Sequence, residues 1–181
     1  MVKKSFLECF FRIVYILNQD VIYMWKKIKP YVISILIALG VGGLSGFLSR
    51  EGMQIYQATA TKPPLSPPDI VFPIVWSILY ILMGISSALV YVNREKNPTV
   101  AYEGLRAYTL QLIMNFFWSI VFFNMQAYLF AFIWLLAMEI VIIYMIFKFR
   151  QVSPLAAYLQ IPYAVWCVFA LYLNFMTFVL N

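Results

Sequence analysis

Five apolar runs, each long enough to cross a lipid bilayer, make up most of this chain of 181 residues. A transmembrane helix needs about 20 mainly apolar residues to cross about 30 Å of hydrocarbon. The predicted spans are Tyr31–Ser49, Ile70–Val92, Leu105–Phe123, Tyr128–Phe147 and Pro154–Leu180. Hydrophobic residues make up 64% of the chain and charged residues 11%, whereas a soluble domain averages about 25% charged residues. The sequence therefore predicts an all-α integral membrane protein, folded as a bundle of five transmembrane helices.

The residues before the first span have no comparable pattern. We divide the chain into a basic and apolar extension, residues 1–30, and a five-helix membrane domain, residues 31–181. The extension contains the short apolar run Phe6–Leu17, whose basic flanks favour a helix lying on the surface of an anionic membrane. Alternatively, the sequence from Met24 reads as the N-terminus of a membrane protein, and residues 1–23 result from a mis-assigned start codon. Both interpretations stay open at this point.

The positive charges are distributed unevenly between the two sides of the predicted bundle. The N-terminus and the second and fourth gaps between spans carry most of the Lys and Arg, whereas the other side carries only Arg50 and Lys62. By the positive-inside rule, we expect a multi-pass protein of the cell membrane with a cytoplasmic N-terminus and an extracytoplasmic first loop. No basic face on a soluble fold is visible, so a nucleic-acid partner is not expected.

Metal and redox chemistry have little support in this sequence. The two cysteines, Cys9 and Cys167, form no C-x-x-C motif, and histidine is absent altogether. Histidine is the commonest general base and a frequent metal and haem ligand. We therefore predict no metal site and no resident cofactor.

The stretch from Lys62 to Gly84, KPPLSPPDIVFPIVWSILYILMG, combines a stiff segment with an aromatic helix. Its four early prolines predict extended chain, because proline fixes φ and lacks an N–H group. Asp69 follows at a position where its carboxylate could cap the next helix. One face of that helix carries Pro73, Trp76, Tyr80 and Gly84. A stiff lid leading into an aromatic face is typical of the edge of a binding pocket.

Two further helices carry faces of the same kind. On the third span Gln111, Asn115 and Trp118 recur at helical spacing, and buried amides in hydrocarbon must find partners inside the protein. On the fifth span the corresponding residues are Pro162, Trp166, Ala170 and Asn174. Together the three faces suit a large, flat, mostly apolar ligand with a few polar edges, such as a tetrapyrrole. Ordinary packing between helices is the alternative explanation for such spacing.

Three motifs carry a resemblance to a known family. The run from Lys62, the run QLIMNFFWSIVFF from Gln111 and the run IPYAVWCVFALYLNF from Ile161 resemble the tryptophan-rich sensory protein family, also called the translocator protein or peripheral benzodiazepine receptor family. The resemblance covers about Tyr31 to Asn181. It implies a five-helix bundle, commonly dimeric, that binds porphyrins, and in some members sterols or synthetic drug ligands, beneath the first loop.

The resemblance also implies roles for individual residues. Trp76 and Trp166 match the family's pocket tryptophans, Asn115 its pocket asparagine and Trp118 the aromatic residue one turn further on. Ala170 matches a small residue of the pocket wall, and Tyr56 corresponds loosely to an aromatic residue of the first loop. The full predicted ligand-binding set is Tyr56, Lys62, Trp76, Tyr80, Gln111, Asn115, Trp118, Pro162, Trp166 and Ala170.

Two features refine the expected ligand. No Lys or Arg follows Arg150, so the family's sterol-associated pattern near the C-terminus is absent. Lys62, or Arg50 in the same loop, could pair with a porphyrin propionate; the alternative is that both are solvated loop cations.

Glu139 is an acidic residue in the middle of the fourth span. A charged carboxylate at that depth is costly, so this group should be protonated, paired or turned toward the protein interior. We expect this carboxyl to face lipid or a subunit interface and to be hydrogen-bonded to a neighbouring helix.

Together, these residues and the resemblance predict a membrane receptor or sensor for tetrapyrroles, with porphyrin or haem as a ligand and not a cofactor. The protein should work in membrane lipid, and the resemblance implies a homodimer. The resemblance also implies an enzymatic alternative, oxidative porphyrin breakdown that needs light and oxygen, with Trp76 and Trp166 as the participants. The sequence offers no acid–base pair or cofactor motif, so no firm catalytic residue is assigned. A transporter of porphyrin-like or lipid ligands is a third possibility, although no internal repeat supports it.

Overall fold

The computed structural model describes the backbone of residues 2–181 and the side chains of residues 24–181, and the described backbone contains helices and no strand. The helices are α1 (Val2–Leu48), α2 (Arg50–Thr59), α3 (Val71–Val92), η1 (Arg94–Lys96), α4 (Pro98–Ser119), η2 (Ile120–Asn124), α5 (Tyr128–Val152) and α6 (Pro154–Leu180). The all-helical prediction is confirmed.

Four of the helices in the described part are long and apolar enough to cross a membrane: Met24–Leu48 within α1, and α3, α5 and α6. The predicted third span corresponds to α4 continued by the π-helical turn η2. α4 does not meet the same criterion of length and composition. Its first turns carry Glu103 and Arg106, and its inner face carries Gln111 and Asn115, which lower its hydropathy.

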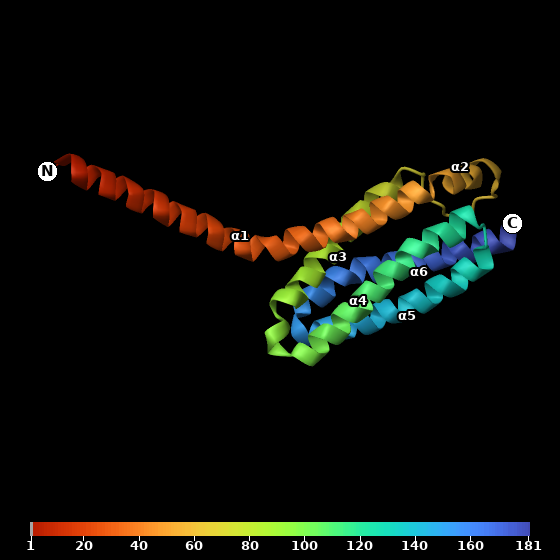
Figure 1. Cartoon of the computed structure of the whole chain (residues 1–181). Coiled ribbons are helices and arrows are strands. Elements are labelled where there is room, and N and C mark those ends of the chain that lie inside the picture. The colour runs from red at the N-terminus through yellow and green to blue at the C-terminus, as the bar shows by residue number, and fades with distance from the viewer. Residues whose placement is uncertain (1) are drawn as a thin grey trace.

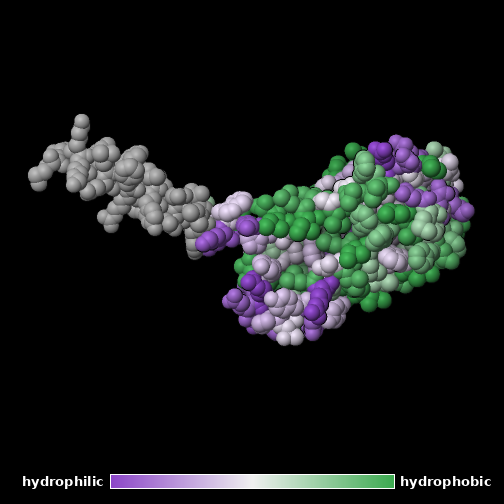
Figure 2. Space-filling view, viewed as in Figure 1, coloured by the Kyte–Doolittle hydropathy of each residue, from purple (hydrophilic) through white to green (hydrophobic). Residues whose placement is uncertain are grey.

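The five long helices form a closed ring in which α1 lies beside α3, α3 beside α6, α6 beside α5, α5 beside α4, and α4 beside α1 (Figure 1). Apolar residues cover the body of this bundle, and polar residues gather toward its two ends (Figure 2). Such a surface fits a protein whose middle is solvated by lipid rather than by water.

Local sequence signals set where α4 and α6 begin. Pro98 and Pro154 each occupy the first helical turn, where the missing N–H group costs nothing. The residue before each proline caps the helix: Asn97 Oδ1 accepts from Val100 N at 3.5 Å, and Ser153 Oγ accepts from Ala156 N at 3.4 Å. α4 and α5 are further joined by an ion pair between Lys148 and Glu103, 2.6 Å apart.

The first loop differs from its prediction in two ways. Its first half is the helix α2, and only residues 60–70 are irregular. The prolines do keep Lys62–Pro68 out of a helix, as predicted. Asp69 does not cap α3, however, because the N-cap position is Ile70 and the Asp69 carboxylate binds Lys62 instead.

The N-terminal extension is continuous with the first span. α1 runs through Pro30 without a break, so the proposed division at residue 30 does not coincide with the end of a helix. Its N-terminal part projects away from the bundle (Figure 1). The choice between a surface helix and a mis-assigned start rests on residues 1–23, whose side chains lie outside the described residues.

Candidate functional site

A cavity of about 550 Å³ lies beneath α2 and the irregular segment 60–70. Its walls come from α1, α3, α4, η2 and α6, and its roof from α2 and the loop. Aromatic residues dominate the lining: Tyr56, Phe72, Trp76, Tyr80, Trp118, Phe122, Phe123 and Trp166. Ligand sites for small molecules have volumes of about 300–1,000 Å³ and mostly apolar walls with a few placed polar groups. This cavity has both properties.

The floor of the cavity is held by a chain of hydrogen bonds across the bundle. Tyr80 Oη on α3 donates to Asn115 Oδ1 on α4 at 2.6 Å, and Asn115 Nδ2 donates to Tyr163 Oη on α6 at 3.3 Å. Tyr163 Oη in turn donates to Gln111 Oε1 at 2.7 Å. All four side chains are buried. The floor is therefore a preorganised polar surface, fixed by three helices at once.

The upper wall joins α4, η2 and α6 around an indole ring. Trp118 stacks on Phe122, with the ring centroids 5.3 Å apart, and its Nε1 donates to Asn174 Oδ1 at 3.2 Å. Tyr56 of α2 packs against the same Phe122 at 5.3 Å, and its hydroxyl lies 3.3 Å from Thr177 Oγ1. The π-helical turn brings Phe122 under Tyr56, and such turns are frequent at functional sites.

The irregular part of the lid is tied to the end of α6. The Asn181 side chain makes two hydrogen bonds with the Thr61 backbone, accepting from its N–H at 2.8 Å and donating to its carbonyl at 3.2 Å. Tyr172 Oη donates to the Pro64 carbonyl at 3.1 Å. These three contacts are exposed, so the lid is held by bonds for which water competes.

The glycines of α1 differ in how much room there is for a side chain at each position. A Cβ on Gly42 would overlap the Tyr80 ring, so this glycine lets α1 and α3 approach closely. Gly43 and Gly46 also line the cavity, and a Cβ on either would meet no neighbour within 4 Å. Gly40 likewise has open space. The close approach of α1 and α3 therefore falls at Gly42 on α1 and at Gly84 on α3, where an added Cβ would overlap the Ile35 backbone.

Eight of the ten predicted binding residues line the cavity: Tyr56, Lys62, Trp76, Tyr80, Asn115, Trp118, Trp166 and Ala170. Gln111 lies one turn below Asn115 and does not line the cavity; it is linked to the lining residue Asn115 through the Tyr163 hydroxyl. Pro162 is exposed on the outer side of α6, away from the cavity lining. The role of the lining residues in binding stays a prediction.

The two loop cations considered as partners for a propionate differ in their surroundings. Lys62 Nζ is already paired with Asp69, at 2.8 and 3.0 Å from the two carboxylate oxygens, and both residues line the cavity. Arg50 lies 4.0 Å from Glu51 and over the Phe47 ring, outside the lining. Lys62 is therefore positioned to meet a ligand carboxylate, but in competition with Asp69.

Several residues of the site were missed from the sequence. Tyr163, buried in the floor network, shares a helical face with Ala170 and Asn174, but the series through Pro162 reaches the same two residues, so periodicity alone does not identify it. Phe122 and Phe123 depend on the π-helical turn, and Asn181 on the path of the lid, so no local pattern indicates them.

Glu139 is buried inside the bundle, so the interpretation that it faces lipid or a subunit interface is wrong. Its Oε2 atom has no hydrogen-bond partner among the described residues. Glu139 does not line the cavity. None of the described lining residues comes from α5.

The comparisons with known proteins agree on one family. Residues 33–180 match the model of the TspO/MBR family. The chain is 35% identical to "Tryptophan-rich protein TspO" of Chlorobaculum tepidum over 158 residues, which are 87% of this chain and 99% of the relative. It is 36% identical to "Translocator protein" of Homo sapiens over 151 residues, 83% of this chain and 88% of that protein. It is 29% identical to "Tryptophan-rich sensory protein" of Cereibacter sphaeroides over 149 residues, 82% of this chain and 90% of the relative.

Proposed function

Because this chain belongs to the TspO/MBR family, we propose that it is a membrane receptor that binds a tetrapyrrole in the aromatic cavity beneath its first loop. The observation that carries this proposal is the cavity itself. Three indole rings, Trp76, Trp118 and Trp166, stand around one space of about 550 Å³. Aromatic side chains gain most from a flat ring that can stack against them or meet their edges.

The polar groups of the cavity suit the edges of such a ligand. Asn115 and Tyr80 form the floor, Asn174 and Thr177 lie near the roof, and Lys62 stands at the rim. A porphyrin carries its carboxylates on one edge, which could replace Asp69 at the Lys62 ammonium. A free porphyrin and a haem share this chemistry, and the cavity walls supply stacking to both.

We also propose that α4 crosses the membrane, which brings the number of transmembrane helices to five. In this topology the N-terminus is cytoplasmic and α2 lies on the extracytoplasmic side. α4 has 22 residues, as α3 has, and it is a member of the ring of long helices. The amides of Gln111 and Asn115 on α4 are buried and hydrogen-bonded inside the bundle. They therefore do not contact lipid, where an unpaired amide would be costly.

The test is a titration of the detergent-purified protein with protoporphyrin IX in the dark, followed by tryptophan fluorescence. We expect saturable quenching, with affinity weakened about tenfold, or about 1.4 kcal/mol, in Trp76→Phe, Trp166→Phe and Asn115→Leu. Trp25→Phe is the matched control, because Trp25 is 57% exposed on α1 and outside the cavity lining.

Quenching that never saturates and is equal in all variants would mean that the porphyrin only partitions into the micelle, and it would refute the proposed site. Illumination of the saturated complex, with analysis of the products, separates a receptor from an enzyme that breaks the porphyrin down.

A further inference from the structure

Three buried polar atoms below the cavity floor have no hydrogen-bond partner on the described protein. Gln160 is completely buried on α6, and both its Nε2 and its Oε1 atoms are unpaired. Tyr108 is 7% exposed on α4, and its Oη atom is also unpaired. Native proteins pair about nine in ten of such buried groups or more, with protein or with ordered water.

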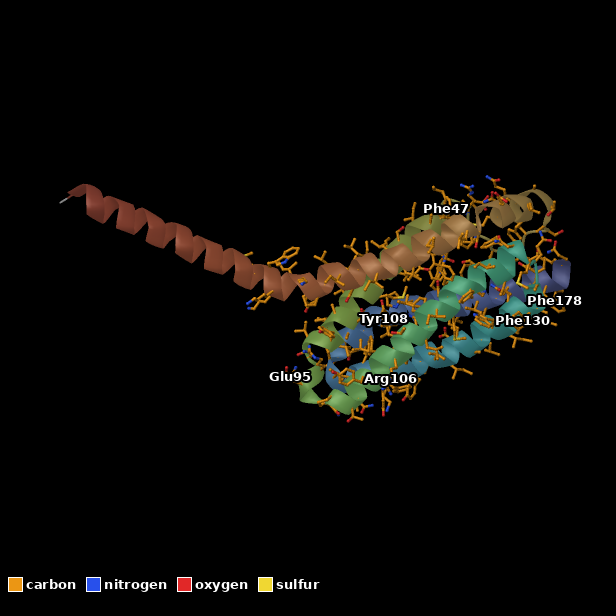
Figure 3. The ribbon with its side chains drawn as sticks, in the orientation of Figure 1. Phe47, Glu95, Arg106, Tyr108, Phe130 and Phe178 are labelled. Carbon is orange, nitrogen blue, oxygen red and sulfur yellow. The ribbon has the colours of Figure 1, made fainter. Side chains whose placement is uncertain are left out.

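The register of the helices brings these two side chains to one level. α4 and α6 run in the same direction, because each is antiparallel to α5 between them (Figure 1). Tyr163 of α6 is bonded to Gln111 and Asn115 of α4. One turn toward the N-terminus of both helices, Gln160 therefore stands level with Tyr108. Figure 3 shows Tyr108 on the part of α4 between Arg106 and the middle of the bundle.

Two further polar side chains border this level. Gln111 lies one turn above Tyr108, and its Nε2 meets only a weak acceptor, the Met83 sulfur at 3.8 Å. Ser87 lies one turn beyond Met83 on α3, which runs opposite to α4, so it reaches the level of Tyr108. Its hydroxyl donates to the Gly84 carbonyl at 3.1 Å and keeps its lone pairs free to accept.

We propose that Ser87, Tyr108, Gln111 and Gln160 hold one or more internal water molecules beneath the cavity. A buried water makes about three hydrogen bonds, and this layer offers donors and acceptors from three helices. All four side chains are neutral, so nothing there offsets the charge of an ion. Water there would pair the amide of Gln160 and the phenol of Tyr108, which the described side chains leave without partners.

This water layer continues the hydrogen-bonded chain that fixes the floor. Water bound to Gln111 Nε2 holds the amide so that its Oε1 accepts from Tyr163, and Tyr163 then accepts from Asn115. Gln160 and Tyr108 are thus positioning residues for the floor, acting through water and Gln111.

The test compares thermal unfolding of Gln160→Met, Tyr108→Phe and the double variant in detergent. If water bridges the two, each single change strands the other groups and lowers the unfolding midpoint by about 2–4 °C or more. The unfolding midpoint of the double variant should then fall by less than the sum of the two single falls, because both changes remove the same bound water. Gln151→Met and Tyr158→Phe are matched controls, since both positions are exposed.

A high-resolution structure of the unaltered protein is the second measurement. We expect ordered water within hydrogen-bond distance of both the Gln160 amide and Tyr108 Oη. Direct bonding between these two side chains, or a rise in the midpoint for either single variant with additive effects, would overturn the proposal.

Discussion

Asn115 is the residue on which the floor of the cavity depends, because it both accepts from Tyr80 and donates to Tyr163. Its importance could be predicted from the spacing on α4, since Gln111, Asn115 and Trp118 recur on one face. Tyr163 could not be separated from Pro162 in the same way. On α6 the series through Pro162 and the series through Tyr163 both reach Ala170 and Asn174, and only the packing against α3 and α4 decides between them.

The Lys62–Asp69 ion pair gives a prediction at the residue scale. Both side chains are partly exposed, at 40% and 50%, so the pair itself should contribute at most about 1 kcal/mol to stability. We expect Asp69→Asn to tighten the binding of protoporphyrin IX severalfold, because it releases the Lys62 ammonium for a ligand carboxylate. Lys62→Met should weaken binding by a similar factor. Titration at low and high salt measures both changes.

Protoporphyrin IX dimethyl ester is the control for that prediction, because it lacks the carboxylates. Its affinity should be the same in both variants as in the unaltered protein. An equal response of the acid and the ester would show that Lys62 does not meet a carboxylate.

At the scale of whole elements, α2 and η2 are the cavity-lining elements that the sequence did not predict. The proline signals just after Arg50–Thr59 favour a loop for the whole segment, although no proline lies within these ten residues themselves. The π-helical turn has no local signal, since its wider bonding is stabilised by the contacts of Phe122 and Phe123. Gly52 lets α2 rest on this turn, where a Cβ would overlap Phe123 and Asn124.

The crossing of α1 and α3 gives a prediction at the element scale. Alanine is favoured over glycine in a helix by about 1 kcal/mol, so Gly→Ala should stabilise α1 wherever there is room. Gly40→Ala has room and should raise the unfolding midpoint slightly. Gly42→Ala should lower it and weaken porphyrin binding, because the added methyl group displaces the Tyr80 ring from Asn115.

Thermal unfolding and the porphyrin titration, run on both variants, check this prediction. If Gly42→Ala binds porphyrin as tightly as Gly40→Ala does, porphyrin binding does not depend on the position of the Tyr80 ring, and the prediction is wrong.

For the whole molecule, hydropathy was sufficient to predict an all-helical membrane fold. In hydrocarbon each span must satisfy its backbone internally, which leaves helices as the solution for runs of this length. The order of the helices around the ring could not be predicted, because it depends on which faces pack together. The placement of α5 outside the cavity lining and the burial of Glu139 follow from that order.

The proposed topology gives a prediction at this scale, tested in a Cys9→Ser background by labelling single cysteines with a membrane-impermeant maleimide. The native Cys167 is buried and should not react. Ala58→Cys on α2 and Met125→Cys after α4 should be labelled on intact cells. Glu95→Cys, near the opposite end of the bundle in Figure 3, should be labelled only after permeabilisation.

Met125→Cys tests α4 directly, because this position and Glu95 lie on opposite sides only if α4 crosses the membrane. Labelling of Met125→Cys and Glu95→Cys from the same side would contradict the five-span arrangement.

The most direct measurement is an experimental structure of the protein with protoporphyrin IX bound. We expect density for the flat ring inside the cavity, in contact with Trp76, Trp118 and Trp166 and above the Asn115–Tyr80 hydrogen bond, with its carboxylates toward Lys62. Porphyrin found only in the detergent around the helices, with the cavity free of it, would contradict the proposed receptor function.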